Sequence, residues 1–394
     1  MEEVKNQYKK LPYPPRNKDD LIISTDIFEI LEENGLTIPE DGFKIAVLGC
    51  GTGDSVLCLA LQCKLYGLKN YVIDAYDLSK ESLDICKERL IHFDCLENVN
   101  LLEENILEIK KTSYYDYVNS IGVLHHLPDP VIGLQKVQVI LKPEGIAQIM
   151  LYASIGRTGV YHLQSIFKLL QTQQMEDEQS LELVKDVLKN LPQSNWFNHS
   201  KDWFKDQKEY GDAGIYDMFL HSQDQAFSVL GVYKLCDRVG LTLNNFIPAY
   251  IYNIDEYAEY STDNPRVNQQ LAELFAGNIV KHNFICSKRD KLEPAGDVIT
   301  PIIPNKEMEK MFNNSKKDEK TTLEFINYLG HKFKIDVTIK EGDAEKYFDY
   351  VAGADVDEEP EILTKFKLYN MFFRSSGKYD HKIIAEKYQN PNKS

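Results

Sequence analysis

One short segment, residues 44–61, constrains the fold of this chain more than any other. It reads KIAVLGCGTGDSVLCLAL, in which an apolar, β-branched run is followed by three alternating glycines and an apolar stretch of helical length. This order is typical of a buried strand that passes through a glycine turn into a helix. The spacing is G-x-G-x-G, one residue short of the G-x-G-x-x-G of dinucleotide loops. The turn therefore predicts a ligand site but leaves the ligand open.

Short strand-like runs and helical stretches alternate from Lys44 to Ala153. The apolar runs are KIAVLG, NYVIDAYD, YDYVNSIG and GIAQIMLYA, and an amphipathic stretch separates each from the next. This alternation predicts parallel strands joined by crossover helices, which is a doubly wound α/β sheet. Two later strand-like segments, residues 241–253 and 278–290, are expected to return to the same sheet.

Changes in composition and a proline-containing linker predict three parts. They are an N-terminal arm with a short helix (1–42), an α/β domain with a polar helical insertion at about 156–235 (43–292), and a small α+β C-terminal domain (295–394).

Local patterns predict individual elements in the two outer parts. A helix is expected over residues 24–35, with Ser24 or Thr25 as its N-cap and its end near a glycine. In the C-terminal domain we expect a helix over residues 321–330 and an alternating strand over residues 333–340.

Composition narrows the classes of function. The 394 residues are 43% hydrophobic, which is ample for a packed core, and their formal net charge of -16 should repel nucleic acids and anionic membrane surfaces. The seven cysteines form no C-x-x-C pair, which favours reduced, intracellular thiols. Because the first residues are polar and no long apolar run occurs, we expect no signal peptide, no membrane span and a cytosolic location.

Polar residues follow the predicted strands at the edge where open parallel sheets bind ligands. A side chain at either of the first two glycines of the turn is expected to occupy the space of the ligand. Asp77 ends the second strand and can accept both hydroxyls of a ribose, while Ser79 caps the next helix and leaves that carboxylate available. Asn105 and Ile106 in the third turn are suited to hydrogen-bond and pack an adenine. Together these residues predict a nucleoside-type ligand.

In this order the motifs VLGCGTG, YDLS, ENIL, SIGVLHHLPDP and VILKPEGIAQIMLYA resemble those of class I S-adenosylmethionine-dependent methyltransferases, over about residues 40–153. The resemblance implies a mostly parallel, seven-stranded Rossmann-like sheet, S-adenosylmethionine as cofactor and methyl transfer as the reaction. It also implies cofactor contacts in four groups: Gly49, Cys50, Gly51 and Gly53 at the methionine and ribose, Asp77 and Leu78 at the ribose and adenine, Asn105 and Ile106 at the adenine, and Ser120 and Gly122 beside the methionine.

Two residues depart from the family pattern. Val47 stands where the first motif usually has an acid, and Asn105 stands where an Asp often receives the adenine amino group. An Asn carbonyl still accepts that hydrogen bond, so the second change is mild.

Segments outside the core carry a narrower resemblance. QYKKLPYPPR, MLYASIGRTGVYHLQSIFKLL and DMFLHSQDQAFSV are similar to bacterial methyltransferases often joined to tetratricopeptide repeats, a group that includes the rickettsial protein-lysine methyltransferases. That group also tends to have an apolar residue at the position of Val47. The resemblance implies a protein side chain, lysine above all, as the methyl acceptor. A small-molecule acceptor and a catalytically silent binding subunit are the alternatives.

The proline-rich arm is a candidate lid. Tyr8, Tyr13 and Arg16 come from it and are expected to fold over the cofactor, with Tyr8 as a cofactor contact and Tyr13 beside the transferred methyl group. The alternative is that the arm only packs against the domain.

A lysine acceptor must lose a proton before it attacks, so the site needs a base or a lowered acceptor pKa. His221, held by Asp217 or Asp224, or else His125 at the fourth turn, is predicted to take that proton. Adjacent helical residues point in different directions, so at least one of His125 and His126 is expected to be structural. No metal-ligand spacing or phosphate-binding loop is present in the sequence, and we expect no metal.

Overall fold

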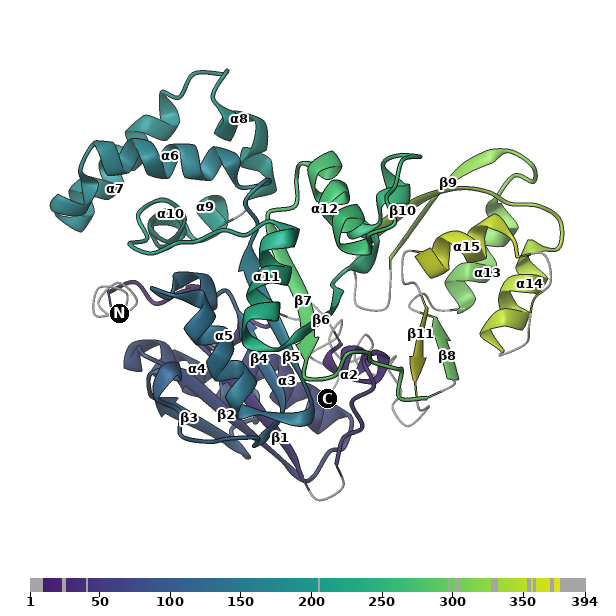
Figure 1. The fold of residues 1–394 in the computed structure, drawn as a ribbon, viewed down its shortest axis with the longest axis horizontal. Helices are drawn as coiled ribbons and strands as arrows, with labels where there is room; N and C mark the ends of the chain where they lie inside the picture. The colour runs from purple at the N-terminus through teal and green to yellow at the C-terminus, as the bar shows by residue number, and fades with distance from the viewer. Residues whose placement is uncertain are drawn as a thin grey trace.

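A seven-stranded sheet forms the centre of the computed structural model (Figure 1). Its strand order is β3-β2-β1-β4-β5-β7-β6, and all neighbours are parallel except that β7 runs antiparallel to β5 and β6. The strands are β1 (Phe43–Leu48), β2 (Tyr71–Asp77), β3 (Val99–Glu103), β4 (Tyr115–Ile121), β5 (Leu141–Tyr152), β6 (Thr242–Phe246) and β7 (Lys281–Ser287). The expected doubly wound sheet, with two late strands returning to it, is confirmed. The structure describes residues 10–22, 26–39, 42–204, 206–296, 298–301, 305–326, 332–352, 356, 359–368 and 372–375.

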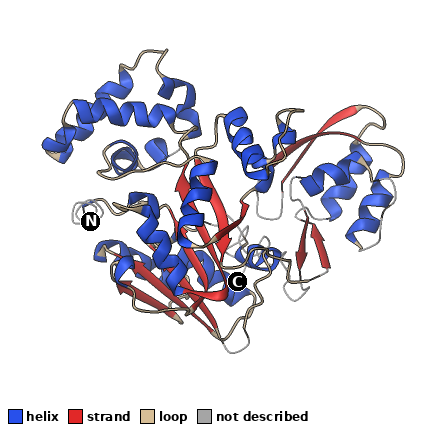
Figure 2. Cartoon of the chain, in the orientation of Figure 1, coloured by secondary structure: helices blue, strands red, loops and turns tan. Residues whose placement is uncertain are grey.

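Helices cover both faces of the sheet (Figure 2), and each face has its own apolar core. One face carries α2 (Ile27–Glu33), α3 (Asp54–Leu65) and α4 (Lys80–His92). The other carries α5 (Pro130–Ile140) and α11 (Val229–Val239), with α12 (Pro265–Ala276) packed against α11. Short 3-10 turns complete the connections: η1 (Ile106–Glu108), η2 (Leu124–His126), η5 (Ala249–Tyr252) and η6 (Ile254–Glu256).

The first described helix, α2, begins one or two residues later than the sequence suggests. Its N-cap is Asp26, whose carboxylate accepts from the backbone N–H groups of Phe28 and Glu29. Asp26 also accepts from the hydroxyl of Tyr66 at the end of α3, so a tertiary contact selects this cap. The proposed caps Ser24 and Thr25 lie outside the described residues.

A group of helices between β5 and α11, here called the cover, forms a separate layer (Figure 1). It has its own apolar core, which includes Val160, Phe167 and Phe219. The predicted insertion extended to about residue 235, but α11 packs into the core of the sheet through residues such as Val232, so the cover ends before it. The cover consists of α6 (Thr158–Leu169), η3 (Thr172–Gln174), α7 (Asp177–Lys189), α8 (Trp196–Ser200), η4 (Lys201–Trp203), α9 (Asp206–Glu209) and α10 (Gly211–Phe219).

The C-terminal part is an α+β module with a third apolar core. The helix expected over residues 321–330 is wrong, because residues 320–326 form strand β9 and pair antiparallel with β10. Thr322, Leu323 and Phe325 are residues that favour strands, and the alternation buries Leu323 while Lys320 and Thr322 face solvent. The elements are β8 (Val298–Pro301), α13 (Asn305–Asn314), β9 (Lys320–Ile326), β10 (Lys332–Thr338), α14 (Asp343–Val351), α15 (Glu361–Leu368) and β11 (Phe372–Ser375).

The state of the cysteines and the character of the helices can be compared with the sequence-based expectations. Each of the seven cysteines is a free thiol, as expected. Among the described residues no helix has the combination of length and apolar character that crossing a bilayer demands.

Candidate functional site

A cavity of about 650 Å³ lies where the carboxyl ends of β1, β2 and β4 meet the N-terminal arm and the cover. This volume is in the range of cofactor and substrate sites. Eleven of the residues predicted from the sequence line it: Tyr13, Arg16, Gly49, Cys50, Gly51, Asp77, Leu78, Asn105, Ile106, Gly122 and Asp217. The cavity therefore joins the predicted cofactor residues to part of the predicted acceptor site.

The glycine turn is tight because protein atoms, not only a ligand, crowd it. Gly49 and Gly51 have φ angles of 65° and 52°, the left-handed region that favours glycine. A Cβ atom on Gly49 would lie 2.5 Å from a methyl carbon of Val123, and one on Gly51 would lie 2.6 Å from the carbonyl oxygen of Tyr13. A side chain there would collide with the fourth turn and with the arm, and that it would also occupy ligand space stays a prediction.

Asp77 connects the glycine turn to the second strand. One of its carboxylate oxygens accepts from the backbone N–H of Gly51 and the other from the N–H of Ser79, each at 2.8 Å. Ser79 caps α4 through its own hydroxyl, as predicted. Burial raises the pKa of the Asp77 carboxyl, while the backbone N–H groups oppose that rise. Each carboxylate oxygen has a second lone pair, so Asp77 can still accept from ligand hydroxyls.

Asn105 has a local role that the sequence did not indicate. Its side-chain oxygen accepts from the N–H of Leu107 at 3.0 Å and so caps η1. Asn105 and the buried Ile106 both line the cavity. Leu78 lines it from the second turn.

Gly53 and Ser120 do not line the cavity, whereas Cys50 does. A Cβ atom on Gly53 would lie 2.4 Å from the sulfur of Cys86. Ser120 is fully buried at the end of β4, and its hydroxyl has no hydrogen-bond partner among the described residues. A hydrogen bond with Cys86 and burial raise the pKa of Cys50, so its thiol stays protonated. Tyr8 lies outside the described residues.

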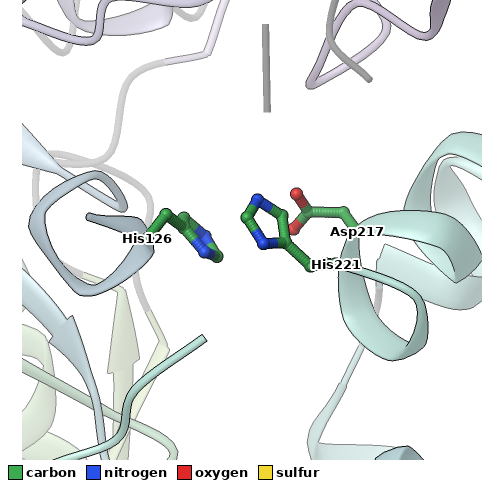
Figure 3. A group of neighbouring side chains, drawn as sticks. All are labelled: His126, Asp217 and His221. Carbon is green, nitrogen blue, oxygen red and sulfur yellow. The ribbon is translucent and has the colours of Figure 1, made fainter. Parts of the chain in front are cut away.

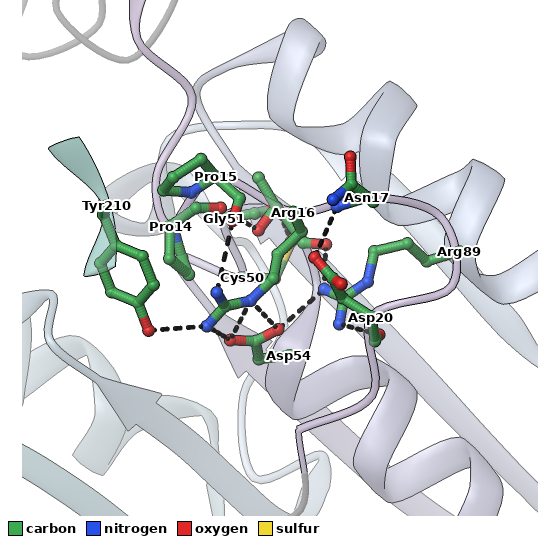
Figure 4. A network of polar contacts seen from close by, with 11 residues as sticks. Pro14, Pro15, Arg16, Asn17, Asp20, Cys50, Gly51, Asp54, Arg89 and Tyr210 are labelled. Atoms are coloured by element: carbon green, nitrogen blue, oxygen red, sulfur yellow. Dashed lines mark hydrogen bonds and ion pairs between the residues drawn. The ribbon is translucent and has the colours of Figure 1, made fainter. Parts of the chain in front are cut away.

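The arm is bound to the glycine turn and to the cover (Figure 4). The hydroxyl of Thr52 donates to the carbonyl of Pro14 at 2.7 Å. Arg16 donates to both carboxylate oxygens of Asp54 and, at 3.1 Å, to the hydroxyl of Tyr210. The arm therefore forms one wall of the cavity and links the sheet to the cover.

Arg89, which was not predicted from the sequence as a site residue, binds the Asp54 carboxylate from the side opposite Arg16. Its guanidinium lies 2.8 Å from Asp54 and donates to the backbone carbonyls of Thr52 and Asp20. Its side chain is fully buried although it belongs to the amphipathic helix α4. With Arg16, two guanidiniums share one carboxylate at the first turn of α3, so the site retains positive charge beside the glycine turn.

Two histidines and an aspartate meet at the opposite end of the cavity. In Figure 3 the ring of His221 lies between His126 and Asp217, and the two imidazoles stack with centroids 3.8 Å apart. One nitrogen of each imidazole and one carboxylate oxygen of Asp217 lie within 4.8 Å of one another, close enough to form a metal-ligand set. His126 and Asp217 line the cavity. Burial lowers the pKa of His221 well below its usual value, so His221 is neutral at pH 7.

His125 and Asp224, two other predicted members of this region, do not line the cavity. His125 stacks on Tyr152 with centroids 3.9 Å apart, and burial lowers its pKa well below the usual value. Asp224 accepts from Gln164 at 2.9 Å and lies 3.9 Å from the buried guanidinium of Arg157. The structure thus brings His126, rather than His125, to the cavity.

The resemblance seen in the sequence extends to known proteins. Residues 47–147 match a family model described as a methyltransferase domain. An uncharacterised protein of a Synechococcus species is 27% identical over 205 residues, which cover 52% of this chain and 48% of that protein. A demethylmenaquinone methyltransferase of Staphylococcus aureus is 30% identical over 106 residues, or 27% of this chain and 41% of that enzyme. The chain therefore spans about half the length, or less, of these curated relatives.

Solved structures match the fold over most of the chain. PKMT2 from Rickettsia typhi in complex with AdoHcy has a TM-score of 0.56 at 15% identity, covering 88% of this chain and 74% of that one. A second structure of PKMT2 has a TM-score of 0.54 at 18% identity and covers 91% and 71%. These matches confirm the predicted Rossmann-like methyltransferase fold.

Proposed function

We propose that this chain, which carries a class I S-adenosylmethionine-dependent methyltransferase domain, transfers a methyl group to the side chain of a protein lysine. One observation carries the proposal: a single cavity joins the nucleoside-type residues at the glycine turn to a polar and aromatic end beneath the cover. A transferase needs both ends in one space, because the donor and the acceptor must meet in line.

The residues of the turn fit S-adenosylmethionine. Asp77 retains acceptor capacity for the ribose hydroxyls, and Ile106 offers an apolar surface for the adenine. The positive charge that Arg16 and Arg89 leave around Asp54 suits the carboxylate of the methionine part. When bound, the cofactor supplies a methyl group activated on a sulfonium. The chain's own residues then have to orient an acceptor, exclude water and take a proton.

The opposite end of the cavity suits a cationic side chain. The ring of Tyr152 lies there, with its centroid 5.6 Å from that of His126, and Trp203 also lines the cavity. Aromatic faces attract ammonium groups. Asp217 adds a carboxylate at the same end. Trp203 is 43% exposed, so this end reaches the protein surface, where a lysine of another protein can enter. The likeness of the outer segments to rickettsial protein-lysine methyltransferases supports the same acceptor.

One observation favours a small-molecule acceptor instead. Arg157 lines the cavity and is 3% exposed, yet its Nε and one terminal nitrogen have no hydrogen-bond partner among the described residues. A carboxylate or phosphate on a small substrate would satisfy those donors. With a lysine as acceptor, these donors of Arg157 are left with the carboxylate of Asp224, which lies 3.9 Å from the guanidinium.

Transfer of labelled methyl groups distinguishes the two acceptors. The full chain is incubated with tritiated S-adenosylmethionine and a native cell lysate, and the label is followed into protein and into the small-molecule fraction. We expect labelled protein bands and, after hydrolysis, labelled methyl-lysine. Label in small molecules alone contradicts the lysine acceptor, and no label in either fraction contradicts transferase activity.

A matched variant identifies the label as this enzyme's product. Gly51→Val collides with the Tyr13 carbonyl and the turn, so it should abolish binding of S-adenosylhomocysteine in calorimetry and remove the labelled bands. Bands that remain belong to another methyltransferase in the lysate.

A further inference from the structure

The peptide groups on either side of Gln223 contact both histidines at the acceptor end. Gln223 follows α10 in the cover. Its carbonyl oxygen lies 2.8 Å from Nδ1 of His126, and its N–H donates to Nδ1 of His221 at 3.1 Å. A carbonyl accepts and an N–H donates, so the two imidazoles carry opposite tautomers. His126 has its hydrogen on Nδ1, whereas His221 receives a hydrogen bond there.

The opposite tautomers give the two rings different chemical roles. The electron pair of neutral His126 is on Nε2, and His126 lines the cavity. Neutral His221 carries its hydrogen on Nε2, so that nitrogen is a donor. Its remaining electron pair, on Nδ1, already accepts from the backbone of Gln223. His221 is therefore not suited to take a proton from a substrate, although its position near Asp217 first indicated that role.

We infer that His126 is the catalytic base of this site and takes the acceptor proton on Nε2. The inference rests on the proposed transfer to a lysine. The acceptor ammonium gives its proton to His126 Nε2, its freed electron pair forms the bond to the methyl carbon, and the carbon–sulfur electron pair stays on sulfur as the thioether of S-adenosylhomocysteine. The proton on His126 then passes to solvent before the next turnover.

Two neighbours fix the position of His126. A carboxylate oxygen of Asp217 lies near its ring, and the Gln223 carbonyl keeps the Nδ1 hydrogen in place. Arg157, 3.6 Å from the ring of Tyr152, and the cationic cofactor both disfavour a charged acceptor amine nearby, which eases its loss of a proton. The titratable or charged groups that surround His126 are His125 of η2, Tyr152 of β5, Arg157 before α6, Asp217 of α10 and His221.

The same three side chains could instead hold a metal ion, but the backbone contacts favour a base. A metal takes the electron pair of each imidazole, and the second nitrogen then carries a hydrogen. His126 meets this condition. His221 does not, because its Nδ1 faces the N–H of Gln223 and a hydrogen there would oppose that donor. A metal on Nε2 of His221 would require the ring to turn and give up this contact.

Nitrogen-15 NMR of the histidine-labelled full chain reads the tautomers directly, without any methyl acceptor. The chain is saturated with S-adenosylhomocysteine, and the His126 and His221 signals are assigned from the His126→Asn and His221→Asn variants. We expect the Nδ1–H tautomer for His126 and the Nε2–H tautomer for His221. An Nε2–H tautomer at His126 overturns the inference. So does a shift of both rings on adding zinc that EDTA reverses, because it identifies a metal site.

Kinetics with the same two variants test the chemistry. In His126→Asn the amide nitrogen can still donate to the Gln223 carbonyl, but no base remains. In His221→Asn the amide oxygen can still accept from the Gln223 N–H. With poly-L-lysine as acceptor, we expect His126→Asn to lower kcat about 100-fold or more at neutral pH. The loss should shrink as the pH approaches about 10.4, where lysine deprotonates unaided. His221→Asn should lose less and keep the parent's pH profile.

The outcomes separate the two proposals. If His126→Asn keeps the parent's kcat and pH profile, the base is another group. If the parent itself does not methylate poly-L-lysine while the NMR tautomers are as expected, the lysine acceptor fails, and the assignment of the His126 electron pair stands. Binding of S-adenosylhomocysteine by calorimetry checks that each variant is folded. Should His126→Asn not fold, recovery of His126→Ala activity by added imidazole tests the missing base, and no recovery contradicts the inference.

Discussion

At the scale of single residues, the glycine turn shows how protein contacts and a ligand site impose the same residue type. Gly51 holds a left-handed backbone, donates its N–H to Asp77 and lies against the carbonyl of Tyr13. A side chain at this position would strain the left-handed backbone and collide with the Tyr13 carbonyl, although the backbone N–H itself would remain. The turn therefore depends on the arm as much as on the sheet, which a motif match alone does not reveal.

Gly51→Ala tests this dependence, with Gly67→Ala as its matched control. Both glycines have positive φ angles, 52° and 69°, but only Gly51 has a neighbour within contact distance of an added Cβ. Both variants should lose about 1–2 kcal/mol of stability from backbone strain. Only Gly51→Ala should also weaken S-adenosylhomocysteine binding, because the Tyr13 carbonyl has to move. Urea unfolding and calorimetry measure the two effects, and equal affinities in both variants contradict the argument.

The buried histidines predict a loss of stability in mild acid. His125 and His221 have folded-state pKa values well below the unfolded value of about 6.5. As the pH falls through 6.5, the unfolded chain binds their protons first, so the free energy of unfolding decreases by up to about 1.4 kcal/mol per pH unit for each. Above about pH 6.5 the contribution of these two histidines to the free energy of unfolding is fully present. Burial raises the pKa of Glu33 to about 7, which gives the opposite slope between its unfolded pKa and that value.

Comparison of a variant with its parent isolates one histidine from the other groups. His221→Asn should reduce the slope of unfolding free energy against pH between about 5.5 and 6.5 by up to the contribution of one proton. Urea denaturation at several pH values gives that slope. An unchanged slope means that the folded and unfolded chains bind equal numbers of protons at His221 over this range, which contradicts a lowered folded-state pKa.

At the scale of elements, local periodicity and turn residues were sufficient for the sheet and for most of the cofactor end. The strand runs, the glycine turn, Asp77 and the Ser79 cap are all short-range patterns. The sequence missed what long-range contacts decide. Asp26 caps α2 while it also accepts from the hydroxyl of Tyr66, and residues 320–326 form a strand because β10 pairs with them. His126 is brought to His221 from 95 positions earlier in the chain by the fold alone.

The arm is the element whose function can be tested separately from the sheet. Arg16 is nearly buried and binds Asp54 and Tyr210, whereas Lys10 on the same arm makes an exposed ion pair with Asp177. Arg16→Ala should cost about 1–3 kcal/mol, the range for hydrogen bonds to charged groups, and should weaken S-adenosylhomocysteine binding. Lys10→Ala should change neither property noticeably, because exposed ion pairs contribute little.

Deletion of residues 1–16 tests whether the arm as a whole contributes to turnover. The sheet has its own two cores, so the truncated chain should stay folded while turnover falls. Circular dichroism and the labelled-methyl assay measure the two properties. Full activity in the truncated chain, together with unchanged cofactor affinity in Arg16→Ala, would reduce the arm to packing.

At the scale of the whole molecule, the separate apolar cores suggest separate folding units. The described core of the C-terminal module, which includes Leu323, Val337 and Phe366, shares no residue with the cores of the sheet. The module joins the rest through the β8–β11 pair, which packs near α2, and through the preceding segment, where Ala295 donates its N–H to Glu32. No described residue of the module lines the cavity.

Calorimetry of the full chain should therefore show two unfolding transitions, of which S-adenosylhomocysteine raises only one. A ligand that binds only the folded state stabilises it by about 2.7 kcal/mol at 100 times its Kd, and this gain belongs to the unit that holds the site. The methyltransferase transition should move upward and the module's transition should stay in place. Gly51→Val, which removes the site, should abolish the shift without moving the module. A single transition that moves as a whole would mean that the contacts of β11 and Ala295 with α2 couple the module to cofactor binding.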